Sequence, residues 1–163
     1  MTPLTNLQRI KSSRRAPVRG DTFAMLLPTA TYLFGRVILV ESQQGPMPGA
    51  NLLYIYAYQS KAKAPDEACL RPNNLLIPPV WTNRLGWTKG LFETIGSGML
   101  KPTDLLPQHC FRRHDYVYLD ETGRRLRGRV EPCGEWGLVS YRWIDDHVSD
   151  ALGIPRVPES PED

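Results

Sequence analysis

The amino-acid sequence predicts a mainly β fold, a twisted antiparallel sheet or small barrel of about seven to eight strands that ends in a short C-terminal helix. Two observations support this prediction. Short runs rich in apolar, aromatic and β-branched residues recur along the chain, separated by clusters of Gly, Pro, Asn or Asp. Helical signals are confined to one turn near residue 103 and a segment near the C-terminus. The protein is therefore expected to be mainly β, with no more helix than an α+β fold contains.

The first three strands are predicted from side-chain alternation and from turn residues. The runs 22–27 and 32–40 form a hairpin across a turn that begins with proline. Gly35 inside the second run indicates a bulge or the close approach of another backbone. In the run 52–58, alternate residues share a face, which is typical of a strand. Residues 59–74 mix lysines, prolines and acids without periodicity and are predicted to form a surface loop.

The second half of the chain is predicted to contain shorter elements. Strands are expected at 75–77 and 91–95, and Thr103 is placed to cap a single helical turn. The clearest hairpin is expected over residues 115–131, whose return strand covers 126–130. The remaining predicted elements are a strand over 138–144 and a helix over 145–152.

Charge is distributed so that the two ends differ from the middle. Residues 1–20 carry five basic and no acidic residues, whereas residues 21–155 carry 14 basic and 14 acidic residues. We therefore expect a flexible basic arm over 1–17, a single β-rich domain over 18–155 and a disordered acidic tail over 156–163.

Composition indicates a soluble cytoplasmic protein. Hydrophobic residues make up 41% and charged residues 23% of the chain, and no apolar run approaches the ~20 residues of a membrane-spanning helix. The N-terminus lacks the apolar stretch of a secretory signal. Cys69, Cys110 and Cys133 are odd in number and irregularly spaced, so reduced thiols are expected.

No motif indicates a metal centre, a cofactor or a catalytic site. Cys110, His114 and Cys133 are residue types that bind zinc, but they lack the paired close spacings of zinc sites, and buried cysteines are the alternative interpretation. The three histidines have no recognisable catalytic setting, and His147 is read as a solvated helical residue. The Gly96-Ser97-Gly98 segment lacks the remaining residues of a phosphate-binding loop and is predicted to be a turn.

Five residues are candidates for a partner-binding surface. Arg125, Arg127 and Arg129 alternate along the predicted return strand, so they project from one face about 6–7 Å apart. Such a stripe suits phosphates or carboxylates, although charged side chains also protect exposed strand edges from aggregation. Trp87 and Trp136 each adjoin a glycine and are expected to be partly exposed, and core packing is the alternative role for both.

Several short motifs between residues 18 and 115 are similar to those of one known family. They are Arg19-Gly20-Asp21-Thr22-Phe23-Ala24, Phe34-Gly35-Arg36-Val37, Trp87 ahead of Thr94-Ile95-Gly96, and Leu105-Leu106-Pro107. On these motifs the chain resembles the immunity protein twenty-six family, which also includes HocA-type phosphotriesterases.

The resemblance implies a cytoplasmic antidote that binds and neutralises the cognate toxin of a bacterial polymorphic-toxin system. The alternative that it implies is the hydrolysis of organophosphate triesters. The matching residues are of types that build turns, core and strands, so no catalytic residue is assigned. Binding is favoured, because steric and electrostatic complementarity can neutralise a toxin without a reactive cluster. Nucleic-acid binding by the basic arm is a third and less favoured interpretation.

Overall fold

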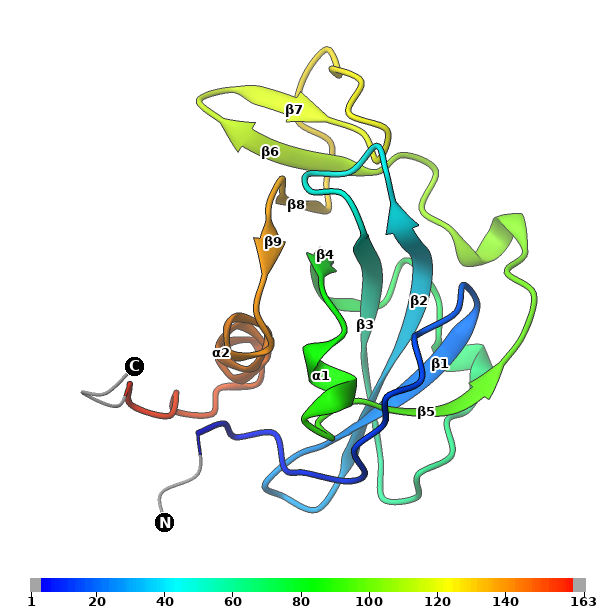
Figure 1. The fold of residues 1–163 in the computed structure, drawn as a ribbon, viewed down its shortest axis with the longest axis vertical. Helices are drawn as coiled ribbons and strands as arrows, with labels where there is room; N and C mark the ends of the chain where they lie inside the picture. The colour runs from blue at the N-terminus through cyan, green and yellow to red at the C-terminus, as the bar shows by residue number, and fades with distance from the viewer. Residues whose placement is uncertain (1–3, 160–163) are drawn as a thin grey trace.

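Two β-sheets and a C-terminal helix form the structure, a computed structural model that describes residues 4–159 (Figure 1). The larger sheet has six strands in the order β5-β1-β2-β3-β4-β9, and the smaller sheet has three in the order β7-β6-β8. Both sheets are twisted and neither closes into a barrel. The predicted mainly β class with a short C-terminal helix is confirmed.

The elements of the described chain follow this order. The strands are β1 (Asp21–Leu26), β2 (Tyr32–Ser42), β3 (Ala50–Ser60), β4 (Leu75–Thr82), β5 (Glu93–Ser97), β6 (Cys110–His114), β7 (Val117–Leu119), β8 (Cys133–Glu135) and β9 (Leu138–Val139). The helical segments are the 3-10 turns η1 (Glu67–Cys69) and η2 (Pro102–Asp104), the single turn α1 (Leu85–Thr88) and the helix α2 (Tyr141–Leu152).

The larger sheet is buried on both faces, because alternate residues of its strands point to opposite sides. One face packs against the N-terminal segment, α1 and α2, which contribute Leu7, Trp87 and Ile144 to the core. The other face packs against the residues after η1 and against β6, which contribute Leu70 and Phe111. Both faces of the central strands therefore lie inside the protein, which explains the continuous apolar run along β3.

The N-terminal segment, which we expected to be a flexible arm, packs along the body within its described part. Leu7 is 2% exposed, and the backbone of Gln8 forms a bridge with Leu26. The buried carboxylate of Asp145 accepts hydrogen bonds from the backbone N–H of Asn6 at 2.9 Å and of Leu7 at 2.8 Å. An apolar side chain and a buried acceptor thus hold this segment in place, and residues 1–3 lie outside the described residues.

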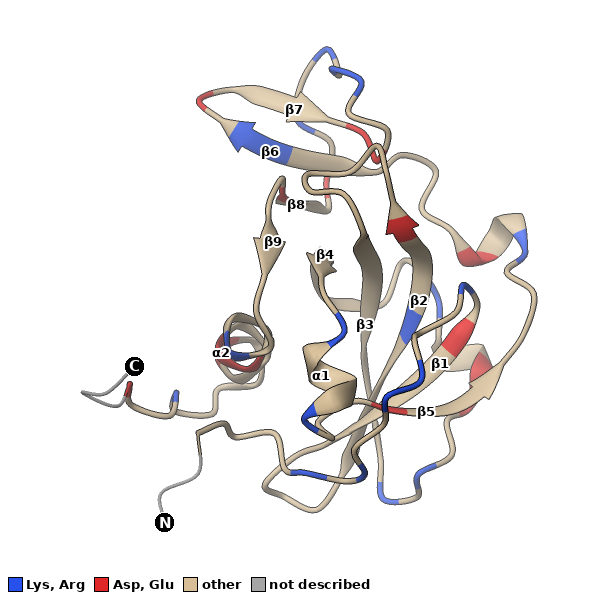
Figure 2. Ribbon diagram, viewed as in Figure 1, with Lys and Arg blue, Asp and Glu red and all other residues tan. Residues whose placement is uncertain are grey.

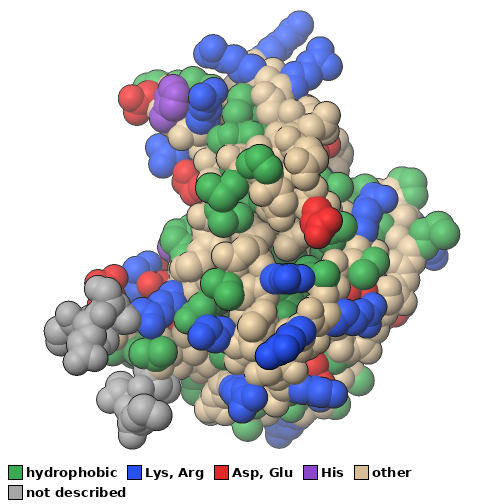
Figure 3. Space-filling view, in the orientation of Figure 1, with side chains coloured by type: hydrophobic (Ala, Val, Ile, Leu, Met, Phe, Trp, Pro, Cys, Tyr) green, Lys and Arg blue, Asp and Glu red, His purple; other side chains and the backbone are tan. Residues whose placement is uncertain are grey.

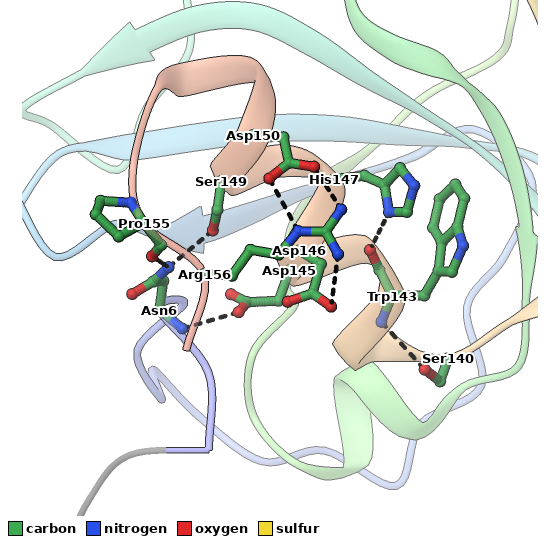
Figure 4. Close-up of polar contacts among 10 residues, drawn as sticks. All are labelled: Asn6, Ser140, Trp143, Asp145, Asp146, His147, Ser149, Asp150, Pro155 and Arg156. Atoms are coloured by element: carbon green, nitrogen blue, oxygen red, sulfur yellow. Dashed lines mark hydrogen bonds and ion pairs between the residues drawn. The ribbon is translucent and has the colours of Figure 1, made fainter. Parts of the chain in front are cut away.

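The two described ends of the chain lie side by side on α2 (Figure 4). The Asn6 side chain donates hydrogen bonds to the hydroxyl of Ser149 at 2.9 Å and to the carbonyl of Pro155 at 2.8 Å. Arg156 then pairs with Asp150, its Nε donating to Oδ1 at 2.9 Å. The acidic tail predicted over 156–163 therefore starts with a residue bound to α2, and residues 160–163 lie outside the described residues.

The prediction of a hairpin over 115–131 is wrong about which strands pair. β7 does pair in an antiparallel way, but its partner is the preceding strand β6, and the turn lies at Asp115–Tyr116. Residues 126–130 form no strand, and the return is reduced to an isolated bridge between Leu119 and Arg125. β7 pairs with β6 because the buried Phe111 of β6 gives the pair an apolar face. The return segment is rich in arginine and glycine and has few apolar side chains to bury.

The strand predicted over 138–144 is also shorter than expected. Only Leu138–Val139 forms a strand, pairing in parallel with the end of β4, and α2 begins at Tyr141. The Ser140 hydroxyl caps the helix by accepting the Trp143 N–H at 3.1 Å. Ile144 and Val148, one helical turn apart, both face the core, so the apolar spacing at this point is helical.

Candidate partner-binding surface

The smaller sheet is attached to the end of the larger sheet by aromatic side chains. The ring of Phe111 on β6 lies 5.4 Å from that of Trp81 on β4, and the ring of Trp136 lies 6.1 Å from Trp81. Phe111 and Trp81 are fully buried, whereas Trp136 is half-buried. The smaller sheet therefore projects from the body on a packed aromatic base (Figure 1).

Six exposed arginines lie on this projection and on the loop that follows it, and together we call them the arginine surface. They are Arg112, Arg113, Arg124, Arg125, Arg127 and Arg129. Figure 2 marks their positions on β6 and on the loop, and Figure 3 shows basic side chains projecting from this end of the molecule.

Much of this positive charge is uncompensated. Arg112 lies 3.5 Å from the carboxylate of Glu135, and Arg129 donates a hydrogen bond to Glu131 at 2.5 Å. Arg125 and Arg127, by contrast, form no ion pair with any residue between 4 and 159. Because exposed ion pairs contribute little, this surface retains guanidinium groups free to bind an external carboxylate or phosphate.

The arginine stripe was predicted from strand spacing, and that geometry is wrong, because residues 126–130 are not a strand. Arg125, Arg127 and Arg129 are nevertheless all exposed. The sequence prediction missed Arg112 and Arg113, which join them only through the pairing of β6 with β7 and β8.

The two predicted tryptophan anchors differ in position. Trp136 is half-buried, as expected, and its ring packs at a tilt against that of Phe111, 6.2 Å away. The expected partial exposure of Trp87 is wrong: the side chain is 1% exposed, lies 5.3 Å from the ring of Phe23, and its Nε1 donates to Thr94 Oγ1 at 3.1 Å. The neighbouring Gly86 gives the ring of Phe92 room to pack, since a Cβ there would lie 2.4 Å from it. That glycine therefore signals close packing rather than exposure.

A buried polar chain ties the loop of the arginine surface to the larger sheet. The Tyr54 hydroxyl lies 2.6 Å from His109 Nε2, and His109 Nδ1 lies 3.2 Å from Glu121 Oε2. Tyr54 also accepts the Leu106 N–H at 3.0 Å. This pattern fits a tyrosine that donates to Nε2 and an Nδ1–H that donates to the carboxylate. Its three members are far apart in sequence, so no local spacing could have predicted it.

Burial determines the protonation states of Tyr54 and His109 in this hydrogen-bonded group. Burial raises the pKa of Tyr54 to about 12, so its hydroxyl stays protonated at neutral pH. Burial also lowers the pKa of His109, although the charge and hydrogen bond of Glu121 act in the opposite direction. The imidazole is therefore neutral at pH 7 and acts as a structural bridge.

The loop itself is ordered by Asp120. Its carboxylate Oδ1 accepts the backbone N–H of Thr122 at 2.9 Å and of Arg124 at 3.0 Å. Burial raises the pKa of Asp120, but the hydrogen bonds from Thr122 and Arg124 outweigh it and hold this pKa below the usual value. An ionised aspartate at neutral pH therefore fixes the turn that presents Arg124 and Arg125.

The cysteines and histidines considered for a metal centre are only partly brought together. Cys110 and Cys133 are buried on adjacent strands with their sulfur atoms 3.4 Å apart, whereas His114 lies at the exposed end of β6. Burial raises the pKa of the Cys133 thiol to about 12, which favours the protonated form. Across residues 4–159, His, Cys, Asp and Glu side chains nowhere form a group of three or more that could hold a metal ion.

The comparisons with known proteins identify the family. Among the described residues, no helix is long and apolar enough to cross a membrane. No curated protein and no solved structure shows significant similarity to the chain. The family described as Immunity protein 26 does match, over residues 18–118, which is more than half of the chain and agrees with the resemblance seen in the sequence. The chain therefore belongs to the Immunity protein 26 family.

Proposed function

We propose that this protein is a cytoplasmic bacterial immunity protein that binds a cognate toxin domain and neutralises it by covering part of the toxin's surface. Membership of the Immunity protein 26 family supports the role. The arginine surface supports binding as the mode of action. Its guanidinium groups are exposed, and only some of them form ion pairs within the fold.

The arginine surface has the properties of a prepared protein interface. Arginine is enriched at interfaces, because its planar fork binds carboxylates through two parallel hydrogen bonds. The loop is already ordered by Asp120 and by the Tyr54–His109–Glu121 chain, so binding costs less conformational entropy. At the β6–β7 turn, Tyr116 is 86% exposed and offers an aromatic anchor beside the charges.

These features define the chemistry of the partner surface. A toxin face that complements this region carries clustered Asp and Glu side chains and a recess that accepts an aromatic ring. Electrostatic attraction then accelerates association, and the rate constant of association falls as salt is added. The phosphotriesterase alternative gains no support from the structure or from the comparisons.

The test uses the toxin domain encoded beside the gene for this protein, with its affinity measured by calorimetry. The double variant Arg125→Ala/Arg127→Ala is expected to weaken toxin binding at least about tenfold, because both guanidinium groups are lost from the interface. Its unfolding free energy is expected to change by no more than about 0.5 kcal/mol, because both side chains are exposed and unpaired.

The matched control is Arg14→Ala/Arg15→Ala, which removes two adjacent exposed arginines from the N-terminal segment. Its affinity for the toxin is expected to stay within about twofold of the wild type. An equal loss of toxin affinity in the two double variants would mean that binding depends on the net charge of the protein and not on the arginine surface. An unchanged affinity in Arg125→Ala/Arg127→Ala would reject the arginine surface as the contact.

A further inference from the structure

A polar pocket lies outside the arginine surface, at the β5 edge of the larger sheet. It has a volume of about 390 Å³, is open to solvent on part of its surface, and is lined by residues of the segments 65–71 and 95–101. Thr22 of β1, Arg36 of β2 and Asp104 of η2 also line it. The volume lies within the range of sites that bind small molecules.

The register of the larger sheet explains why this pocket is open. Gly96, Thr22, Arg36 and Tyr54 are successive partners across β5, β1, β2 and β3. Partners in a sheet share a face, so a position without a side chain and a small hydroxyl residue lie between the sheet edge and Arg36. Toward the β5 edge no large side chain therefore covers Arg36, whose side chain is 12% exposed and contacts Asp104.

The charges that line the pocket leave one cation in excess. Asp104 lies 3.1 Å from Arg36 and 3.6 Å from Arg71, so a single carboxylate faces two guanidinium groups. The side chains of Glu67 and Lys101, which also line the pocket, balance each other. Arg36 Nη1 is buried and, despite this ion pair, lacks a well-aligned hydrogen-bond acceptor among the described residues. The residues that line the pocket thus carry one more positive than negative charge.

The glycines at the pocket wall are not required by the fold. Neither Gly96 nor Gly98 has a positive φ, and a Cβ added to either would meet no protein atom within 4 Å. At position 20, by contrast, the fold does require glycine, because φ is +92° and a Cβ there would lie 1.9 Å from the carbonyl oxygen of Gly98. Side chains at positions 96 and 98 would project into open space beside the pocket, so the two glycines keep it accessible.

We propose that this pocket binds a small oxyanion, the carboxylate or phosphate group of a small molecule or a free anion of that kind. Arg36 and Arg71 supply the positive charge, and Thr22, the sheet partner of Arg36, also lines the pocket. Arginine pairs with both groups through charge-assisted hydrogen bonds. This site is independent of the toxin interface, so either proposal can fail alone.

The test measures the melting temperature of the full chain in inorganic phosphate and in succinate, each against sodium chloride of equal ionic strength. A ligand that binds the folded state raises the melting temperature with increasing concentration, and chloride corrects for general salt effects. We expect at least one of the two anions to raise it in a saturable way, and the stronger one identifies the preferred group. No rise with either anion would overturn the proposal.

Variants locate the site. Gly96→Val adds a branched side chain at the pocket wall, which narrows the access, and is expected to weaken anion binding at least about tenfold. Arg71→Gln, at a half-exposed side chain, is expected to weaken it about tenfold by loss of a charged hydrogen bond. Gly128→Val is the matched control, because Gly128 also has open space and no positive φ but lies in the loop of the arginine surface. An equal rise in melting temperature for the wild type and for both pocket variants would place the anion elsewhere and overturn the proposal.

Discussion

The two sheets of this protein differ in what they expose. The larger sheet buries apolar residues on both faces, and the first seven residues of β3 are all buried. The smaller sheet buries Phe111, Cys110 and Cys133 at its base and exposes arginines on its strands and loop. Burial thus places the stabilising core in the larger sheet, and the proposed recognition surface lies on the smaller sheet and its loop.

This division has a direct consequence for substitutions. A change in the larger sheet should lower the free energy of unfolding through lost packing, with little specific effect on a partner. A change in the arginine surface should alter binding with little effect on unfolding. The junction, which contains the Tyr54–His109–Glu121 chain, should affect both properties.

The largest effect on stability is expected for Phe23→Ala. The Phe23 side chain is fully buried, and its ring lies 5.3 Å from that of Trp87 and 5.2 Å from that of Phe92, so truncation leaves a cavity in the core on one face of the sheet. Urea denaturation should show a loss of about 3–5 kcal/mol. Met99→Ala is the control, because Met99 is 93% exposed and its loss should cost no more than about 0.5 kcal/mol. Similar losses in the two variants would contradict the assignment of the stabilising core.

A smaller loss is expected for Asp145→Ala, which removes the acceptor that holds the N-terminal segment. The backbone N–H groups of Asn6 and Leu7 would lose their partner at a buried position, at a cost of about 1–3 kcal/mol. Hydrogen exchange at the Leu7 amide should accelerate more than exchange in β3. Asp146→Ala is the control, and unchanged exchange at Leu7 in Asp145→Ala would show that the segment is held by other contacts.

The smallest effect is expected at the junction, where stability should depend on pH through His109. Burial lowers the pKa of His109 in the folded state, so the unfolded chain binds the proton more readily. The contribution of the neutral imidazole is complete above its usual pKa of about 6.5 and is lost as the pH falls below that value. The charged or titratable groups that face it are Tyr54, Glu121 and Asp120.

The measurement is the free energy of unfolding at several pH values for the wild type and for His109→Gln. The wild type should lose more stability than the variant between about pH 6.5 and pH 5, because glutamine does not titrate. Parallel curves for the two proteins would mean that His109 does not make the junction sensitive to pH.

The sequence predicted the larger sheet well because its signals are local. Alternation and turn residues located β1, β2 and β3 close to their observed bounds. Trp87 was misjudged because its burial depends on Phe92 packing over Gly86, a contact that spacing does not reveal. Proximity to glycine was thus a poor guide to exposure.

The smaller sheet was harder to predict because its contacts are not local. Its register is decided by the burial of Phe111 against Trp81, and the apolar run after residue 116 pairs backwards rather than forwards. The arginines were visible in the sequence, but their grouping with Arg112 and Arg113 required this pairing. The pocket beside β5 is lined by residues of three strands and of the segment 65–71, so no single segment of the sequence indicated it.

The most direct test of the central claim is hydrogen exchange of the protein with and without the toxin domain encoded beside its gene. Toxin binding is expected to slow exchange most strongly in residues 110–130, which carry the arginine surface, and to leave exchange in the segment 9–15 unchanged. Protection confined to the basic residues 9–15, with none in residues 110–130, would contradict the claim that the smaller sheet is the recognition surface.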